Sequence, residues 1–156
     1  MAWNTIIIDD VKGVVSASEY NSITTASLPD GKTGTQLVEE VISNAIAEAR
    51  GYIAAEASNV LGIEGTVPDE LRATLLVIVR YRIFTRLPKM KALLDDLRVK
   101  EYDEAMRKLR DVSAGNFKLV QPVTPAEPAQ QAGGGSVGLV SKGKKRMRRE
   151  NTGGLF

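Results

Sequence analysis

The stretch TQLVEEVISNAIAEARGYI, residues 35–53, decides the fold because its apolar side chains recur at steps of three and four residues. This spacing is typical of one face of an α-helix packed on a core. Thr33 or Thr35 is expected to cap the helix, and Gly51 indicates a close contact or slight bend. The apolar positions are Leu37, Val38, Val41, Ile42, Ala45, Ile46, Ala49, Tyr52, Ile53 and, further on, Val60.

A second and more apolar helix is predicted to begin at Pro68, because proline suits the first helical position. Its residues 71–79 are apolar on nearly every side, so we expect it in the middle of a bundle or between subunits. Arginines on and after it either cover the core and pair with acids, or form a subunit surface. The residues expected at a subunit or partner interface are Arg72, Leu76, Val79, Arg80, Tyr81, Arg82, Phe84 and Arg86.

A third, amphipathic helix is predicted over residues 99–114, with Gly115 as its stop. The fold class is therefore all-α, with a core of three to four helices over residues 35–117. Residues 1–34, rich in Ser, Thr and Asn, are expected to form an extended N-terminal arm, which could contain a short strand or helix. Prolines and glycines in residues 118–136 predict a linker, and residues 137–156 form a basic C-terminal tail.

The composition of the 156 residues excludes several kinds of chemistry. The chain has no cysteine and no histidine, so thiol or imidazole catalysis, zinc sites on these ligands and disulfides are excluded. The adjacent acids Asp95-Asp96 and Glu39-Glu40 do not converge on a helix, which favours solvated charges over a metal site. We expect no enzyme activity and no cofactor, and we expect no membrane segment because no apolar run is long enough.

The basic tail has three possible uses, namely phosphate binding, docking on an acidic protein, and solubility. Residues 142–150 carry six cationic side chains and one acid, although the net charge of the whole chain is only +2. No aromatic residue lies between the basic ones, which argues against stacking on single-stranded bases. The tail residues expected to contact a partner protein or DNA are Val137, Leu139, Val140, Lys142, Lys144, Lys145, Arg146, Arg148, Arg149, Leu155 and Phe156.

The order of four segments resembles a known family. An alanine-rich helix at 41–53 is followed by Val-Pro-Asp-Glu-Leu at 67–71, Val-Arg-Tyr-Arg-Ile-Phe at 79–84 and Tyr-Asp-Glu-Ala-Met-Arg-Lys-Leu at 102–109. In this order and spacing, residues 37–117 resemble the small helical head–tail connector proteins of tailed phages and prophages, the adaptor class typified by the phage Mu-type connector family.

This resemblance implies a structural virion protein in the neck, assembled in the host cytoplasm. It implies a homo-oligomeric ring, commonly of twelve copies, that docks under the portal protein, surrounds the DNA channel and joins the capsid to a tail or neck completion protein. By analogy, the tail at 137–156 reaches the portal, with genomic DNA in the channel as a further contact. The competing hypothesis is a small nucleic-acid-associated protein that uses the basic tail to bind DNA or RNA.

Overall fold

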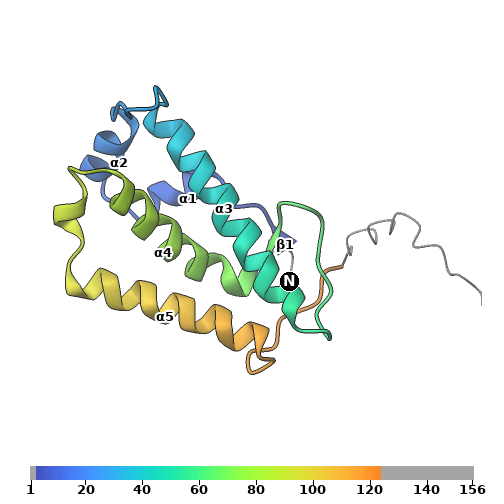
Figure 1. The fold of residues 1–156 in the computed structure, drawn as a ribbon. Coiled ribbons are helices and arrows are strands. Elements are labelled where there is room, and N and C mark those ends of the chain that lie inside the picture. Colours follow the sequence, from blue (N-terminus) through green and yellow to red (C-terminus); the bar gives the residue numbers. More distant parts are fainter. Residues whose placement is uncertain (1–2, 124–156) are drawn as a thin grey trace, which may run out of the picture.

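The computed structural model describes residues 3–123, which form a mostly helical domain (Figure 1). The all-α prediction is confirmed. Its elements, in chain order, are β1 (Trp3–Asn4), α1 (Ile8–Lys12), α2 (Ala17–Thr24), α3 (Gly34–Ala55), β2 (Val67–Pro68), α4 (Asp69–Arg86), the 3-10 helix η1 (Lys91–Leu93) and α5 (Asp96–Ser113).

Helix α4 is the central element of the core, as its apolar sequence predicts. It packs against both α3 and α5, which also contact each other, and the three long helices are visible side by side in Figure 1. Apolar side chains on more than one face of a helix require neighbours on more than one side. The buried residues of α4 are Leu71, Thr74, Leu75, Leu76, Ile78, Val79, Ile83 and Phe84.

The N-terminal segment is part of the core, so the prediction of an extended arm is wrong, although the short strand and helix that the sequence allowed there are present. Ile6, Val11 and Ile23 are only 3%, 0% and 0% exposed. Helix α2 begins with a capping box in which the Ser16 hydroxyl accepts from the Glu19 amide and the Glu19 carboxylate accepts from the Ser16 amide. Burial of these three side chains removes their apolar surface from water, which holds α1 and α2 against the bundle.

The ends of the long helices follow the predicted signals with small shifts. Thr33 caps α3 by accepting from the Gln36 amide, and Gly115 adopts φ 75° after α5, as predicted. Asp95 caps α5, which therefore begins at Asp96. Helix α3 ends at Ala55, so Val60 lies in the following loop and is 46% exposed.

A two-stranded antiparallel sheet closes one end of the bundle, with Trp3 opposite Pro68 and Asn4 opposite Val67. The indole of Trp3 lies so close to Gly62 that a Cβ there would stand 2.7 Å from the ring. Leu119 is buried, and Val60 donates its amide to the Gln121 side chain. The folded domain thus runs past residue 117 and returns its chain to the β1 end.

Candidate functional site: an arginine helix and an open groove

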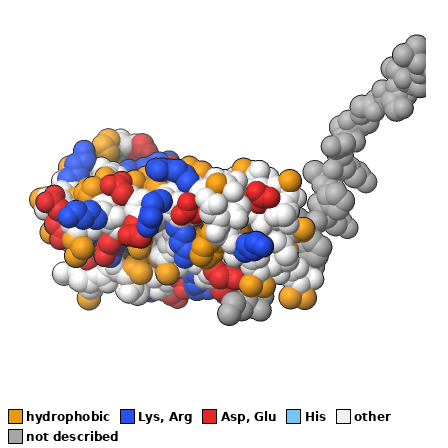
Figure 2. Space-filling model, turned by 90° about the horizontal axis from the view of Figure 1, so that it is seen from below, with side chains coloured by type: hydrophobic (Ala, Val, Ile, Leu, Met, Phe, Trp, Pro, Cys, Tyr) orange, Lys and Arg blue, Asp and Glu red, His pale blue; other side chains and the backbone are white. Residues whose placement is uncertain are grey.

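The four arginines of α4 each make an ion pair within the chain. The pairs are Arg72 with Asp10 at 2.5 Å, Arg80 with Glu101, Arg82 with Glu48 at 2.5 Å, and Arg86 with Glu40 at 2.8 Å. Figure 2 shows cationic and anionic side chains interspersed over the face seen from below. Neighbouring acids therefore neutralise these arginines, which is the pairing that the sequence allowed.

These arginines do not gather into one surface. Arg72 reaches α1, Arg80 reaches α5, and Arg82 and Arg86 reach α3. Arg86 stays exposed and the other three are half-buried. A helix in the middle of a bundle sends side chains toward each neighbour in turn, so spacing along the sequence does not place them together.

Three residues expected at a subunit interface are instead core residues. Val79 and Phe84 are each 0% exposed, and Leu76 is also buried. The guanidinium of Arg98 lies over the Phe84 ring at 4.9 Å and donates to Glu19 at 2.9 Å, so charged groups of α5 and α2 cover the ring. The expectation is corrected for Val79, Phe84 and Leu76, because their side chains pack inside the domain in this conformation.

Tyr81 is the member of the expected interface that makes an aromatic contact. Its ring stacks on that of Tyr102 from α5, with centroids 4.1 Å apart and the planes inclined by 18°. Both tyrosines are half-buried. Burial works to lower the pKa of the Arg82 guanidinium, but hydrogen bonds to Glu48 and Tyr102 outweigh it and raise that pKa. Tyr81, Arg82 and Tyr102 thus form a partly exposed seam between α4 and α5.

Glu40 holds a second charged cluster near the start of α3. It accepts from Lys32 at 2.6 Å and from Arg86 at 2.8 Å. These hydrogen bonds, with the one from Lys32 the larger, lower the pKa of Glu40 from 4.5 to about 2. The adjacent acid Glu39 points elsewhere and lines a groove, so the pair Glu39-Glu40 does not converge on one site.

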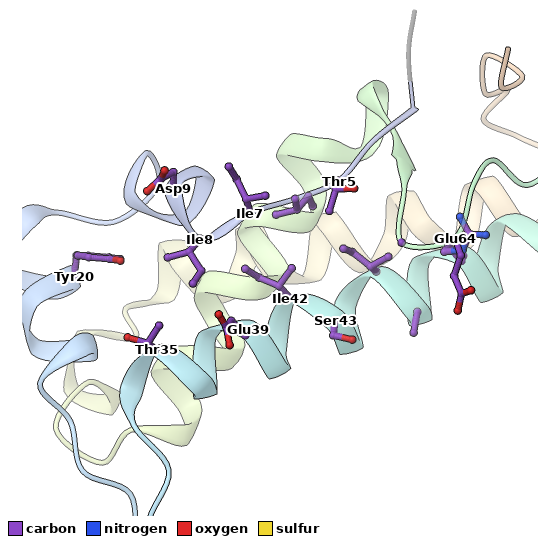
Figure 3. A pocket seen from close by; sticks show the side chains of 15 residues that line it. Thr5, Ile7, Ile8, Asp9, Tyr20, Thr35, Glu39, Ile42, Ser43 and Glu64 are labelled. Atoms are coloured by element: carbon purple, nitrogen blue, oxygen red, sulfur yellow. The ribbon is translucent and has the colours of Figure 1, made fainter. Parts of the chain in front are cut away.

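An open groove of about 970 Å³ lies between the N-terminal segment and α3 (Figure 3). The extended residues before α1 form one wall, and one face of α3 forms the other. Five of its fifteen lining residues are isoleucines. The lining residues are Thr5, Ile6, Ile7, Ile8, Asp9, Tyr20, Thr35, Glu39, Ile42, Ser43, Ile46, Ala47, Arg50, Glu64 and Gly65.

The charged side chains of the groove are mainly acidic. Its single cation, Arg50, donates to the backbone carbonyls of Gly62 and Ile63, both at 3.0 Å, and of Thr66 at 2.8 Å. This arginine is therefore committed to the loop between α3 and β2. Of the three acids, Asp9 pairs with Lys12, whereas Glu39 and Glu64 have no ion pair within residues 3–123.

The groove was not predicted from the sequence. The triplet Ile6-Ile7-Ile8 was the one sequence feature that pointed to an exposed apolar surface here. Successive extended residues point to opposite sides, so one of three adjacent isoleucines must face outward. Ile6 is buried, whereas Ile7 is 53% exposed over the groove. The paired wall is formed by α3, some thirty residues later in the chain, and only tertiary structure brings the two together.

Exposed apolar side chains gather near two opposite ends of the bundle. Val60, Ile63, Val120 and Val123 are exposed at the β1 end, where a hydrogen bond from Val60 to Gln121 joins their segments. Leu93 and Leu97 are exposed at the turn between α4 and α5. Figure 1 shows this turn and the loop after α3 at opposite ends of the molecule. We call these the β1-end patch and the turn patch.

Within the described range, no cluster of three or more potential ligands from His, Cys, Asp and Glu could hold a metal ion. None of the helices in residues 3–123 has the length and apolar character to cross a membrane. The eleven tail residues expected to contact a partner, from Val137 to Phe156, lie outside the described residues, as does most of the predicted linker.

The fold and surface define a small all-α protein with three distinctive features. These are the helix α4, whose arginines are held in ion pairs, the two apolar end patches, and the groove with mainly acidic charged residues. The chain belongs to the phage protein family described as Bacteriophage Mu, Gp36, because the model of that family matches residues 7–137. No curated protein and no solved structure matches the chain. The expected relationship to phage proteins is confirmed.

Proposed function

We propose that this protein is a head–tail connector, a virion protein that forms a ring under the portal, around the DNA channel, and joins the capsid to the tail. Its membership of a Mu family of phage proteins supports a role in the phage particle. The resemblance of residues 37–117 to neck adaptors supports the finer assignment. The role is structural and not enzymatic, with assembly in the host cytoplasm.

The observation that carries the proposal is the pair of apolar patches at opposite ends of the bundle. A connector must bind one protein above it and another below it, and each contact needs its own apolar centre. The β1-end patch (Val60, Ile63, Val120, Val123) and the turn patch (Leu93, Leu97) meet this requirement. We assign the β1-end patch to the portal, because the chain leads from Val123 toward the basic tail at that end.

Contacts between copies in the ring are assigned to the sides of the bundle. A ring requires two different surfaces that fit each other, because the contact is repeated head to tail around an axis. Arg72, Arg82 and Arg86 retain exposed surface while their carboxylate partners hold them in place. Side chains held in this way lose less entropy when a neighbour binds. A ring of twelve copies is the expected assembly.

The test is complementation of a phage that lacks this gene with patch variants. Val60→Lys together with Ile63→Lys should prevent the protein from entering purified heads. Leu93→Lys together with Leu97→Lys should permit entry into heads but leave them without tails, as seen by electron microscopy. Both variants change exposed side chains, so circular dichroism should show an unchanged fold. Normal tailed particles from both variants would contradict the proposal.

A nucleic-acid role is the second candidate, supported by the six cationic side chains of residues 142–149. Full-length protein that binds arbitrary duplex DNA with a steep salt dependence, together with heads that assemble tails without it, would favour this role over the connector. Electrophoretic mobility shift over a salt series measures the binding. A connector whose basic tail contacts protein should bind duplex DNA weakly, and heads should fail to assemble tails without it.

A further inference from the structure

The chemistry of the acidic, isoleucine-lined groove selects one kind of ligand. The groove combines an apolar floor, from Ile42 and Ile46 of α3, with the carboxylates of Glu39 and Glu64, and its one arginine is committed to backbone carbonyls. A fitting ligand is an extended segment that carries apolar side chains followed by lysines or arginines. The chain contains one such segment beyond the described residues, Val-Gly-Leu-Val-Ser-Lys-Gly-Lys-Lys-Arg at residues 137–146.

We propose that this groove binds residues 137–146 of the same chain. The apolar side chains of Val137, Leu139 and Val140 lie over the isoleucines, and the lysines that follow lie beside the carboxylates of Glu39 and Asp9. The inference concerns the free chain and does not depend on the connector role. It assigns the groove as an internal docking site that holds the basic tail until another molecule displaces it.

The position of the last described residues supports an occupant from the same chain. The Trp3 indole donates to the Val120 carbonyl, and Trp3 packs against Gly62 in the loop that contains Glu64 and Gly65. The chain therefore leaves the domain near the Glu64 end of the groove. Fourteen residue steps separate Val123 from Val137, and such a length spans at most about 50 Å. The groove along α3, from Thr35 to Arg50, is about 22 Å long.

The spacing of the segment matches the spacing of the groove. A chain that enters at the Glu64 end runs antiparallel to α3 and meets Ile46 before Glu39. Those two positions of α3 are about 10 Å apart along the helix axis. Leu139 and Lys142 in extended chain are also about 10 Å apart, but they face opposite sides, whereas Leu139 and Ser141 face the same side. If Leu139 lies over Ile46, Ser141 lies near Ser43 on α3, and the ammonium of Lys142 faces the opposite wall, where Asp9 lies.

Engineered disulfides test this register directly, because the chain has no cysteine of its own. The full-length variant Ser43→Cys with Ser141→Cys should form an intramolecular disulfide on mild oxidation in dilute solution. Mass spectrometry and non-reducing gels measure the product and its rate. The matched control, Ser58→Cys with Ser141→Cys, keeps the same tail cysteine and places its partner on the exposed loop that follows α3, outside the groove.

The groove pair should close at least about tenfold faster than the control pair, because docking raises the effective concentration of the two thiols. Equal rates for the two pairs would overturn the proposal. Predominant formation of disulfide-linked dimers would also overturn it, since the occupant would then come from a second copy. Ser43 is exposed, so its replacement leaves the core intact.

Limited trypsin digestion of the otherwise unmodified chain gives a second, independent measurement. Trypsin cleaves after lysine and arginine, so docking should slow cleavage within residues 142–149. Glu39→Lys with Glu64→Lys should speed this cleavage several-fold, and high salt should have the same effect. Glu104→Lys, an exposed change on α5 away from the groove, should leave the rate unchanged. Equal cleavage rates in all three proteins would contradict docking.

Discussion

The indole Nε1 of Trp3 donates a hydrogen bond of 3.0 Å to the backbone carbonyl of Val120, a residue 117 positions later in the chain. This bond joins β1 to the segment after α5 at one end of the bundle. The same indole covers Gly62 in the loop between α3 and β2. One aromatic side chain therefore connects three segments that are far apart in the sequence, and its environment reports on all of them.

Gly62→Ala should destabilise the domain, because the new Cβ would stand 2.7 Å from the Trp3 ring. Overpacking of this kind costs about 1–3 kcal/mol. Urea denaturation followed by circular dichroism measures the free energy of unfolding, and fluorescence of the only tryptophan should shift to longer wavelength. In a Trp3→Ala background the same substitution should cost much less, and an equal cost would argue against the contact.

Gly34→Ala should be strongly destabilising, because its Cβ would lie 1.7 Å from the carbonyl oxygen of Ile23. Backbone must move to relieve this clash, so we expect a loss of about 3 kcal/mol or more in the free energy of unfolding. Gly51→Ala is the matched control in the same helix. Nothing lies within 4 Å of the Cβ that this alanine would add, so the predicted close contact at Gly51 is wrong. This substitution should stabilise α3 by about 0.5–1 kcal/mol, as measured by thermal or urea unfolding.

Ile23→Ala tests whether α2 belongs to the core. The side chain is fully buried, so its truncation should lower the free energy of unfolding by about 2–5 kcal/mol. Ile63→Ala, at a position 57% exposed, should change it by less than about 0.5 kcal/mol. If both substitutions lowered the free energy of unfolding equally little, the N-terminal segment would not unfold cooperatively with the rest of the domain.

The Glu40 cluster predicts a specific dependence of stability on pH. The pKa of Glu40 is lowered from 4.5 to about 2 in the folded chain, so folding favours its charged form. Its contribution is therefore complete above about pH 5 and declines as the pH falls from 4.5 toward 2. The difference in unfolding free energy between the original chain and Glu40→Gln should follow this course. High salt should reduce the difference, because the groups are exposed. A difference that stays constant from pH 7 to pH 2 would contradict the ion-pair origin.

The three long helices were predictable because each has a continuous apolar pattern and clear end signals. Thr33, Asp95 and Gly115 act locally through their own side chains or backbone, so their roles follow from the sequence. The central position of α4 also follows, because residues with apolar character on several faces need several neighbours.

The N-terminal segment was missed because its polar composition outweighed a short signal. Ser16 and Glu19 have the spacing of a capping box, which marks the start of α2. Only eight residues follow in that helix, and a helix so short takes its stability from burial of Ile23 and from the Arg98–Glu19 ion pair. Both contacts are with distant segments, so local sequence does not reveal them.

The candidate site was only partly predictable for a related reason. Arginine-rich helices signal ion pairs, but the acids that neutralise Arg72, Arg80 and Arg86 come from three different helices. Ile7 and Ile46 both line the groove, and the residues next to each of them in the sequence do not indicate that the two lie across one groove. Tertiary packing decides both, and the assignment of the tail residues beyond Val123 stays a prediction.

The bond between Trp3 and Val120 has a practical consequence for anyone who labels this protein. The hydrogen bond places β1 and the segment around Val120 at the same end of the helical bundle. A fluorescent or affinity module fused ahead of β1 would therefore sterically hinder the end that carries Val60 and Ile63. An epitope inserted between α4 and α5 would instead lie at the opposite end of the bundle. Comparing the two fusions would show which end must stay accessible for particle assembly.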